Sequence, residues 1–185
     1  SSRAFIEKAE LGDLVTAIDG TGAKILWLEE VRETISTQEK LEAALLWSRP
    51  LHPVKPEDAA VILFTSGSEG TPKGVVLSHC NLHSNAAQAD ARVTISVKDT
   101  LFNVLPVFHS FGLTGGTILP LLFGVRLFLY PSPLHFKQIP QIAAKVKPTI
   151  MFGTDTFLAG YSRAAKDSDF SSLRFVVAGA EAVRS

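Results

Sequence analysis

A run of six apolar residues leads without a break into a glycine-rich stretch of ten residues. The run covers residues 59–64 and the stretch covers residues 65–74. A short, continuous apolar run of this kind is typical of a buried strand. Gly67, Gly70 and Gly74 have no Cβ atom, so backbone N–H groups can approach an anion closely and positive φ values are accessible. The pattern predicts a strand that leads into a phosphate-binding loop.

The side chains of the stretch also suit a polyphosphate ligand. Lys73 supplies a compact positive charge, and its neighbours supply hydroxyl groups that can donate hydrogen bonds, namely Thr65, Ser66, Ser68 and Thr71. The stretch is not the P-loop of nucleoside triphosphatases, because Lys73 is followed by Gly74 and not by Ser or Thr. An ordinary surface loop is the alternative, since clusters of Gly, Ser, Thr and Pro commonly form one.

The stretch resembles the phosphate loop of the adenylate-forming ligases, which activate acyl and aryl acids and whose loop reads close to Thr-Ser-Gly-Ser-x-Gly-x-Pro-Lys-Gly. Glu69 stands where this family most often has Thr, and the role of that position is open. Residues 105–113 look like the family's substrate-pocket motif, in which His109 would border the acyl channel. Residues 173–181 resemble its adenine-lining strand and turn, which implies that Gly179, Ala180 and Glu181 lie on the adenine side.

The resemblance implies a reaction in two steps. A fatty acid attacks the α-phosphorus of ATP to give acyl-adenylate and pyrophosphate, and a thiol then takes the acyl group. Such chemistry depends on positioning and charge neutralisation. Lys73 and His109 would be the catalytic residues. Mg²⁺ would bind together with the phosphates, and no residue is assigned to it. The residues implied to hold ATP in the loop are Thr65, Ser66, Gly67, Ser68, Gly70, Thr71 and Lys73.

Within the family, the likeness is strongest to the acyl-acyl-carrier-protein synthetase half of bacterial bifunctional 2-acylglycerophosphoethanolamine acyltransferases. It rests on residues 2–11, on Glu69 in the loop and on residues 117–130. This likeness implies that the partners are a fatty acid and acyl carrier protein. It also implies a cytoplasmic chain whose parent protein works at the cytoplasmic face of the bacterial inner membrane. A coenzyme A ligase and a non-catalytic nucleotide- or acyl-binding module are the alternatives.

Short apolar runs alternate with helical patterns, which predicts an α/β fold with a mostly parallel sheet flanked by helices. The expected strands are residues 24–28, 59–64, 75–77, 101–105, 125–130 and 149–152, with a final strand around Val176 and Val177. The expected helices are residues 3–11, 37–47, 79–91, 110–123, 136–146 and 156–165. Residues 49–56 contain three prolines and read as a linker. We therefore divide the chain into an N-terminal segment with linker, residues 1–56, and an AMP-binding core, residues 57–185.

Composition argues against several other classes. The formal net charge is zero, which gives no electrostatic match to nucleic acid. Cys80 is the lone cysteine, so there is no internal disulfide framework. Residues 100–125 carry no charged side chain and are long enough to span a bilayer, but Pro106 and Pro120 favour a strand and a buried helix over a membrane span. His79 and His83 have metal-ligand spacing, yet we expect a capped helix there and no metal site.

The apolar segment around His109 has two readings. Phe108, Phe111, Leu113 and Ile118 would line a lipid-shaped tunnel or belong to the core. Hydrophobic residues make up 46% of the chain and charged residues 19%, which is more apolar than a short domain needs. We therefore expect a fragment of a longer ligase. Because the family's C-terminal catalytic lysine has no counterpart in these residues, we expect the 185-residue chain alone to be inactive.

Overall fold

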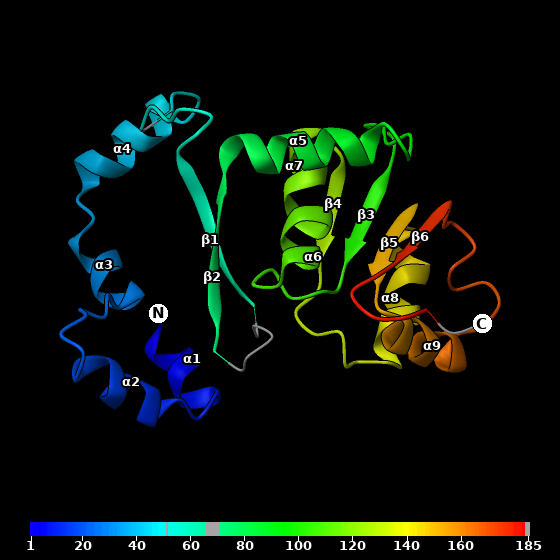
Figure 1. Ribbon diagram of the computed structural model, residues 1–185, viewed down its shortest axis with the longest axis horizontal. Coiled ribbons are helices and arrows are strands. Elements are labelled where there is room, and N and C mark those ends of the chain that lie inside the picture. Colours follow the sequence, from blue (N-terminus) through cyan, green and yellow to red (C-terminus); the bar gives the residue numbers. More distant parts are fainter. Residues whose placement is uncertain (51, 66–70, 184–185) are drawn as a thin grey trace. The chain divides into compact units, whose positions relative to one another are not determined.

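The computed structural model describes residues 1–50, 52–65 and 71–183. The chain forms two compact units, Ser1–Pro53 and Val54–Ser185 (Figure 1). The described residues of the first unit form the helices α1 (Arg3–Lys8), α2 (Gly12–Asp19), α3 (Leu28–Thr34) and α4 (Thr37–Leu46). None of these four helices contains a buried residue. Packing within this unit therefore contributes little to its stability.

The strand predicted at residues 24–28 is wrong. Residues 24–27 have no regular structure, and α3 begins at Leu28. Glu29 and Glu30 stand in its first turn, where carboxylates interact favourably with the positive end of the helix dipole. The apolar run of residues 25–28 is too short for its periodicity to distinguish a strand from the start of a helix. Helix α2 was not predicted, whereas the helix predicted at residues 37–47 is confirmed and begins with a capping box between Ser36 and Glu39.

The second unit begins with an antiparallel hairpin of β1 (Ala59–Thr65) and β2 (Lys73–Ser78). Thr65 pairs with Lys73 at the end of the hairpin where the glycine-rich stretch joins the two strands. Helix α5 (His79–Asp90) follows β2 directly, and the Ser78 hydroxyl accepts a hydrogen bond from the Asn81 amide. This capped start confirms the helix predicted at residues 79–91.

A parallel sheet forms the centre of this unit. Its strands are β3 (Thr100–Asn103), β4 (Arg126–Leu129), β5 (Ile150–Gly153) and β6 (Phe175–Ala178), in the order β4-β3-β5-β6. All residues of β3 and β5 are buried. This agrees with the apolar sequence of β5, whereas β3 also buries two polar residues, Thr100 and Asn103. The predicted α/β fold with a largely parallel sheet is confirmed.

Helices cover both faces of the sheet (Figure 1). On one face, Phe102 and Met151 pack with Ile139 of α8 (Gln138–Val146) and Tyr161 of α9 (Asp155–Ala164). On the other face, the core cluster formed by Leu101, Ile150 and their neighbours includes Phe111 and Phe123, which belong to the segment between β3 and β4. The chain leaves β3 toward β4 and leaves β5 toward β6, so its connections diverge between β3 and β5. Ligands of parallel α/β sheets bind outside the carboxyl ends of the strands at such a point.

The helix predicted at residues 110–123 is present but is not uniform. It consists of α6 (Ser110–Leu113), the π-helix η1 (Thr114–Ile118) and α7 (Leu119–Leu122) in direct succession. Pro120 lies in the first turn of α7, directly after the π-helix. Among the residues that the structure describes, no helix combines the length and the apolar character that crossing a bilayer requires.

Candidate active site

A hollow of about 610 Å³ opens at the carboxyl ends of β5 and β6. Its walls come from α5, from the helical segment that follows β3, and from the ends of these two strands. The lining residues are Asn85, Ala89, His109, Ser110, Phe111, Thr114, Gly115, Leu119, Phe152, Val177, Ala178, Gly179 and Ala180. The structure thus brings His109 together with Gly179 and Ala180, which the sequence placed in two separate motifs.

His109 is held by the backbone around it. Its Nδ1 accepts a hydrogen bond from the Phe111 amide at 3.3 Å, so His109 caps the start of α6. Its own amide donates to the Pro106 carbonyl at 3.1 Å. Because Nδ1 is an acceptor, Nε2 carries the proton of the neutral imidazole ring. The ring is exposed and lines the hollow, so this N–H group is available to a ligand.

Aromatic rings and glycines determine the width of the hollow. The rings of Phe111 and Phe152 lie 5.5 Å apart between centroids. A Cβ atom at Gly115 would come within 3.3 Å of the Phe152 ring, and one at Gly179 within 3.3 Å of the Phe111 ring. Both glycines therefore leave space that any other residue would fill.

Only one of the four side chains predicted for the tunnel lines this hollow. Phe111 lies in its wall. Phe108 is 83% exposed and is not a lining residue, and neither are Leu113 and Ile118. The hollow therefore accounts for the apolar side chain of Phe111 but not for those of Phe108, Leu113 and Ile118.

The turn after β6 is anchored to two other elements. The Gly179 amide donates to the Gly153 carbonyl at the end of β5, at 3.2 Å. Ala180 has a φ of 68°, in the left-handed region that side chains with a Cβ seldom adopt. The Glu181 carboxylate accepts a hydrogen bond of 2.5 Å from the Thr156 amide in the first turn of α9. Glu181, which we predicted on the adenine side, does not line the hollow and is engaged with α9.

The predicted phosphate-binding residues are described only in part. Thr65, Thr71 and Lys73 are exposed, and Thr65 and Lys73 face each other at the end of the hairpin. The remaining four, Ser66, Gly67, Ser68 and Gly70, lie outside the described residues. The hairpin and the hollow belong to the same compact unit.

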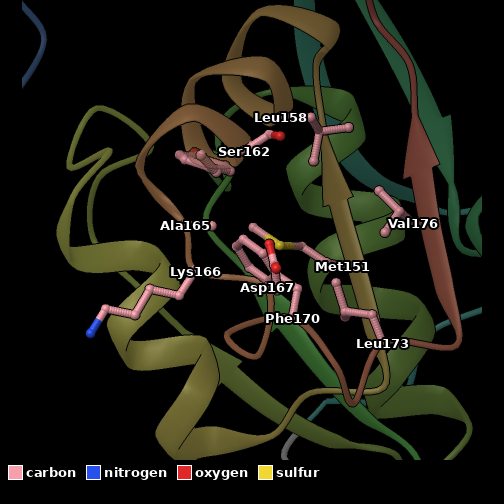
Figure 2. A pocket seen from close by; sticks show the side chains of 10 residues that line it. Met151, Leu158, Ser162, Ala165, Lys166, Asp167, Phe170, Leu173 and Val176 are labelled. Carbon is pink, nitrogen blue, oxygen red and sulfur yellow. The ribbon is translucent and has the colours of Figure 1, made fainter.

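A second hollow, of about 350 Å³, lies between α9, β5 and β6 (Figure 2). Its lining residues are Met151, Leu158, Tyr161, Ser162, Ala165, Lys166, Asp167, Phe170, Leu173 and Val176. Burial raises the pKa of the Tyr161 phenol, whose hydroxyl donates to the Pro133 carbonyl at 2.7 Å. Figure 2 shows the Lys166 side chain extending away from the other lining residues. Because none of the predicted site residues that the structure describes lines this hollow, it offers no support for catalysis.

The histidine pair of α5 lies apart from both hollows. His79, Cys80 and His83 line a third, shallow hollow together with residues 54–56. Within the described ranges, no group of three His, Cys, Asp or Glu side chains is arranged to hold a metal ion. His79 and His83 therefore have no third metal ligand among the described residues.

Sequence reasoning missed several residues of the main hollow. Phe152 and Val177 lie at the carboxyl ends of predicted strands, so the binding rule for parallel sheets would have found them. Asn85 and Ala89 come from α5, and the sequence of that helix carries no signal that it faces a ligand site.

Residues 3–185 match the family model described as AMP-binding enzyme. The chain belongs to the AMP-binding enzyme family. This AMP-binding chain is 31% identical over 173 residues to a mitochondrial medium-chain acyl-CoA ligase of Macaca fascicularis, with 90% of the chain and 27% of the relative covered. It is 32% identical over 123 residues to a medium-chain-fatty-acid–[acyl-carrier-protein] ligase of Teredinibacter turnerae, with 64% of this chain and 19% of that relative covered.

The fold agrees with this assignment. The structure is similar to that of a fatty acyl-adenylate ligase from L. pneumophila in complex with acyl adenylate and pyrophosphate. The TM-score is 0.66 at 27% identity, over 82% of this chain and 27% of that chain. The AMP-binding chain thus spans between about a fifth and just over a quarter of the length of these relatives.

Proposed function

We propose that this chain is part of an ATP-dependent acid–thiol ligase that activates a fatty acid as its acyl-adenylate, with release of pyrophosphate. The acyl group then passes to the thiol of acyl carrier protein. In this proposal the chain supplies one wall of the active site, while other catalytic groups, including a C-terminal lysine, come from a longer parent protein. We retain the bifunctional 2-acylglycerophosphoethanolamine acyltransferase as our proposal for that parent.

The observation that carries the proposal is the hollow itself. It unites the histidine motif after β3 with the turn after β6 outside the carboxyl ends of β5 and β6, the side of a parallel α/β sheet on which ligands bind. Apolar walls from Phe111, Phe152 and Leu119 suit an alkyl chain, and the imidazole of His109 offers a hydrogen bond to the polar end of a ligand. Backbone groups of Gly179 and Ala180 suit the flat adenine ring.

We assign ATP phosphate binding to residues 65–73, with Lys73 as the cation. Described parts of this stretch fit that role, because the Thr65 and Thr71 hydroxyls and the Lys73 ammonium are all exposed at one end of the hairpin. Mg²⁺, when bound with ATP, would neutralise phosphate charge. His109 and Lys73 remain the catalytic residues of the proposal.

A coenzyme A ligase is the second candidate. A relative of each kind is similar to this chain, one named for acyl carrier protein and one named for CoA. Both candidates share the adenylation step and differ in the thiol that accepts the acyl group.

The test is an ATP–pyrophosphate exchange assay on the full-length parent protein with a panel of fatty acids. We expect exchange that depends on the fatty acid. A follow-up with acyl carrier protein and with coenzyme A then shows which thiol is acylated. Absence of exchange with every fatty acid, under conditions where the protein is folded, would rule out the proposed activity.

A further inference from the structure

The last residue of β3, Asn103, has a buried amide whose two hydrogen bonds both go to backbone groups. Asn103 is 1% exposed. Its Oδ1 accepts from the Leu105 amide at 3.0 Å, and its Nδ2 donates to the Gly112 carbonyl at 3.3 Å. Leu105 and Gly112 are the two ends of the segment that carries His109 and Phe111. The Asn103 side chain therefore links the two ends of this segment through hydrogen bonds.

The segment between these two ends is tightly folded. A Cβ atom at Gly112 would overlap the Pro106 carbonyl oxygen, so the chain returns directly over Pro106. The Gly112 carbonyl accepts a second hydrogen bond, at 3.0 Å, from the Thr117 hydroxyl in η1. The position of His109 relative to β3 thus depends on how Gly112 is held.

Gly116 makes room for this arrangement. A Cβ atom at Gly116 would overlap the amide group of Asn103. Gly116 lies in the π-helix η1, and π-helical turns are frequent at functional sites. The Asn103 amide therefore fits only when residue 116 is glycine, because a side chain at position 116 would occupy the same space.

We propose that Asn103 is a positioning residue for the acid-binding side of the hollow. It does not line the hollow, and it acts by fixing His109 and Phe111, which do. An apolar side chain would fill the same space without the cost of burying an amide. The amide, unlike an apolar side chain, holds the Leu105 and Gly112 backbones at a defined distance through its two hydrogen bonds. This inference rests on the proposed function, in which His109 borders the acyl chain.

The kinetic test uses Asn103→Ala in the full-length protein, assayed by ATP–pyrophosphate exchange. Misplacement of a binding group by about 1 Å lowers rates by as much as about 100-fold. We expect the KM for the fatty acid to rise about 10- to 100-fold, while the KM for ATP stays within about twofold. Asn103→Asp keeps the acceptor for Leu105 but turns a carboxylate toward the Gly112 carbonyl, so we expect it to behave like Asn103→Ala.

Thr149→Val is the matched control. Thr149 also makes partly buried hydrogen bonds, but at the amino end of the sheet, where its hydroxyl donates to Asp99 at 2.7 Å. We expect this variant to lose stability and to keep both KM values. The proposal is overturned if Thr149→Val shows the same selective rise, or if Asn103→Ala leaves the KM for the fatty acid unchanged.

An NMR measurement tests whether Asn103 positions His109 and does not depend on enzyme activity. In the same protein labelled with ¹⁵N-histidine, we expect Asn103→Ala to shift the Nδ1 resonance of His109, because the cap on Phe111 loosens. Gly116→Ala should reproduce this shift. The double variant with Asn103→Ala and Gly116→Ala should melt at no lower a temperature than Asn103→Ala alone, because the amide that a side chain at position 116 would overlap is gone.

If the His109 Nδ1 resonance does not shift in Asn103→Ala, the proposal is overturned. If no fatty acid supports exchange by the unsubstituted protein, the proposed function fails and this resonance alone decides the role of Asn103.

Discussion

Arg174 and Asp99 form an ion pair at the amino end of the parallel sheet, with 2.6 Å between Arg174 Nη1 and Asp99 Oδ1. The Asp99 side chain is 1% exposed, whereas that of Arg174 is 49% exposed. The carboxylate also accepts hydrogen bonds from the Thr149 hydroxyl at 2.7 Å and from the Ser96 amide at 2.9 Å. Since residues 99, 149 and 174 directly precede β3, β5 and β6, one buried carboxylate joins the starts of three strands.

We predict that Asp99→Ala lowers the free energy of unfolding by more than about 3 kcal/mol. The change leaves both the Thr149 hydroxyl and the Ser96 amide without their acceptor, at about 1–3 kcal/mol each. Arg174→Ala should cost less, about 1–3 kcal/mol, since the carboxylate keeps its bonds to Thr149 and Ser96. Urea denaturation of both variants measures the difference. Equal losses would mean that the ion pair, and not the network, stabilises this end of the sheet.

The same carboxylate predicts a dependence of stability on pH. Burial raises the pKa of Asp99, but hydrogen bonds from Thr149, Ser96 and Arg174 outweigh it and hold the pKa below its ordinary value of 3.8. A carboxyl with a lowered pKa in the folded state stabilises the fold above the unfolded pKa, and this contribution is lost as pH falls through the folded pKa. We expect Asp99→Asn to melt lower than the unsubstituted protein at about pH 7. The gap should begin to narrow only below the ordinary value of 3.8 and close as pH falls through the lowered folded-state pKa. A gap that widens in acid would contradict this.

Two glycines of one helical segment should respond differently to alanine. A Cβ atom at Gly112 would overlap backbone at Pro106, whereas one at Gly115 would meet the Phe152 side chain at 3.3 Å. We expect Gly112→Ala to cost about 1–3 kcal/mol or more and Gly115→Ala less than about 1 kcal/mol. Thermal melting compares the two. The reverse order of stability would show that the segment folds differently around Pro106.

Lys73→Ala tests the proposed phosphate contact. Removing one preorganised electrostatic contact lowers rates by about 100-fold or more, so we expect pyrophosphate exchange by the full-length protein to fall by that factor. Lys73 is exposed, so the loss of stability should stay within about 0.5 kcal/mol. Lys145→Ala, on the exposed face of α8, is the control and should keep its activity. A normal exchange rate in Lys73→Ala would remove this lysine from the proposed role.

The 185-residue chain alone should not form acyl-adenylate from ATP, Mg²⁺ and a long-chain fatty acid. It contains the hollow and the phosphate-loop sequence, but no counterpart of the family's C-terminal lysine. Weak nucleotide binding is expected, because in our proposal the longer parent protein supplies part of the binding surface. Mass-spectrometric detection of acyl-adenylate with the isolated chain would disprove the two-part mechanism.

Sequence reasoning worked best where local chemistry is strong. The Ser78 cap predicted the start of α5, and the apolar run of residues 59–64 predicted the position of β1. The predicted burial of that strand is wrong, because β1 pairs only with β2 and none of its residues is buried. Sequence reasoning also failed at residues 24–28, where a short apolar run precedes the acidic first turn of α3. It also treated residues 110–123 as one uniform helix, whereas residues 114–118 form a π-helical turn whose Gly116 lies against the side chain of Asn103, a contact that is not local in sequence.

The sequence by itself determined the α/β class, the likeness to adenylate-forming ligases and the residue types available for phosphate binding. These properties follow from periodicity, turn chemistry and short motifs, which each segment carries within its own residues. Only the tertiary structure decided that His109 shares a hollow with Gly179 and Ala180 and that Glu181 is bonded to α9. The physical reason is that strand order is a long-range property. β3, β5 and β6 become neighbours through pairing between distant segments, and that pairing alone brings their carboxyl ends to one place.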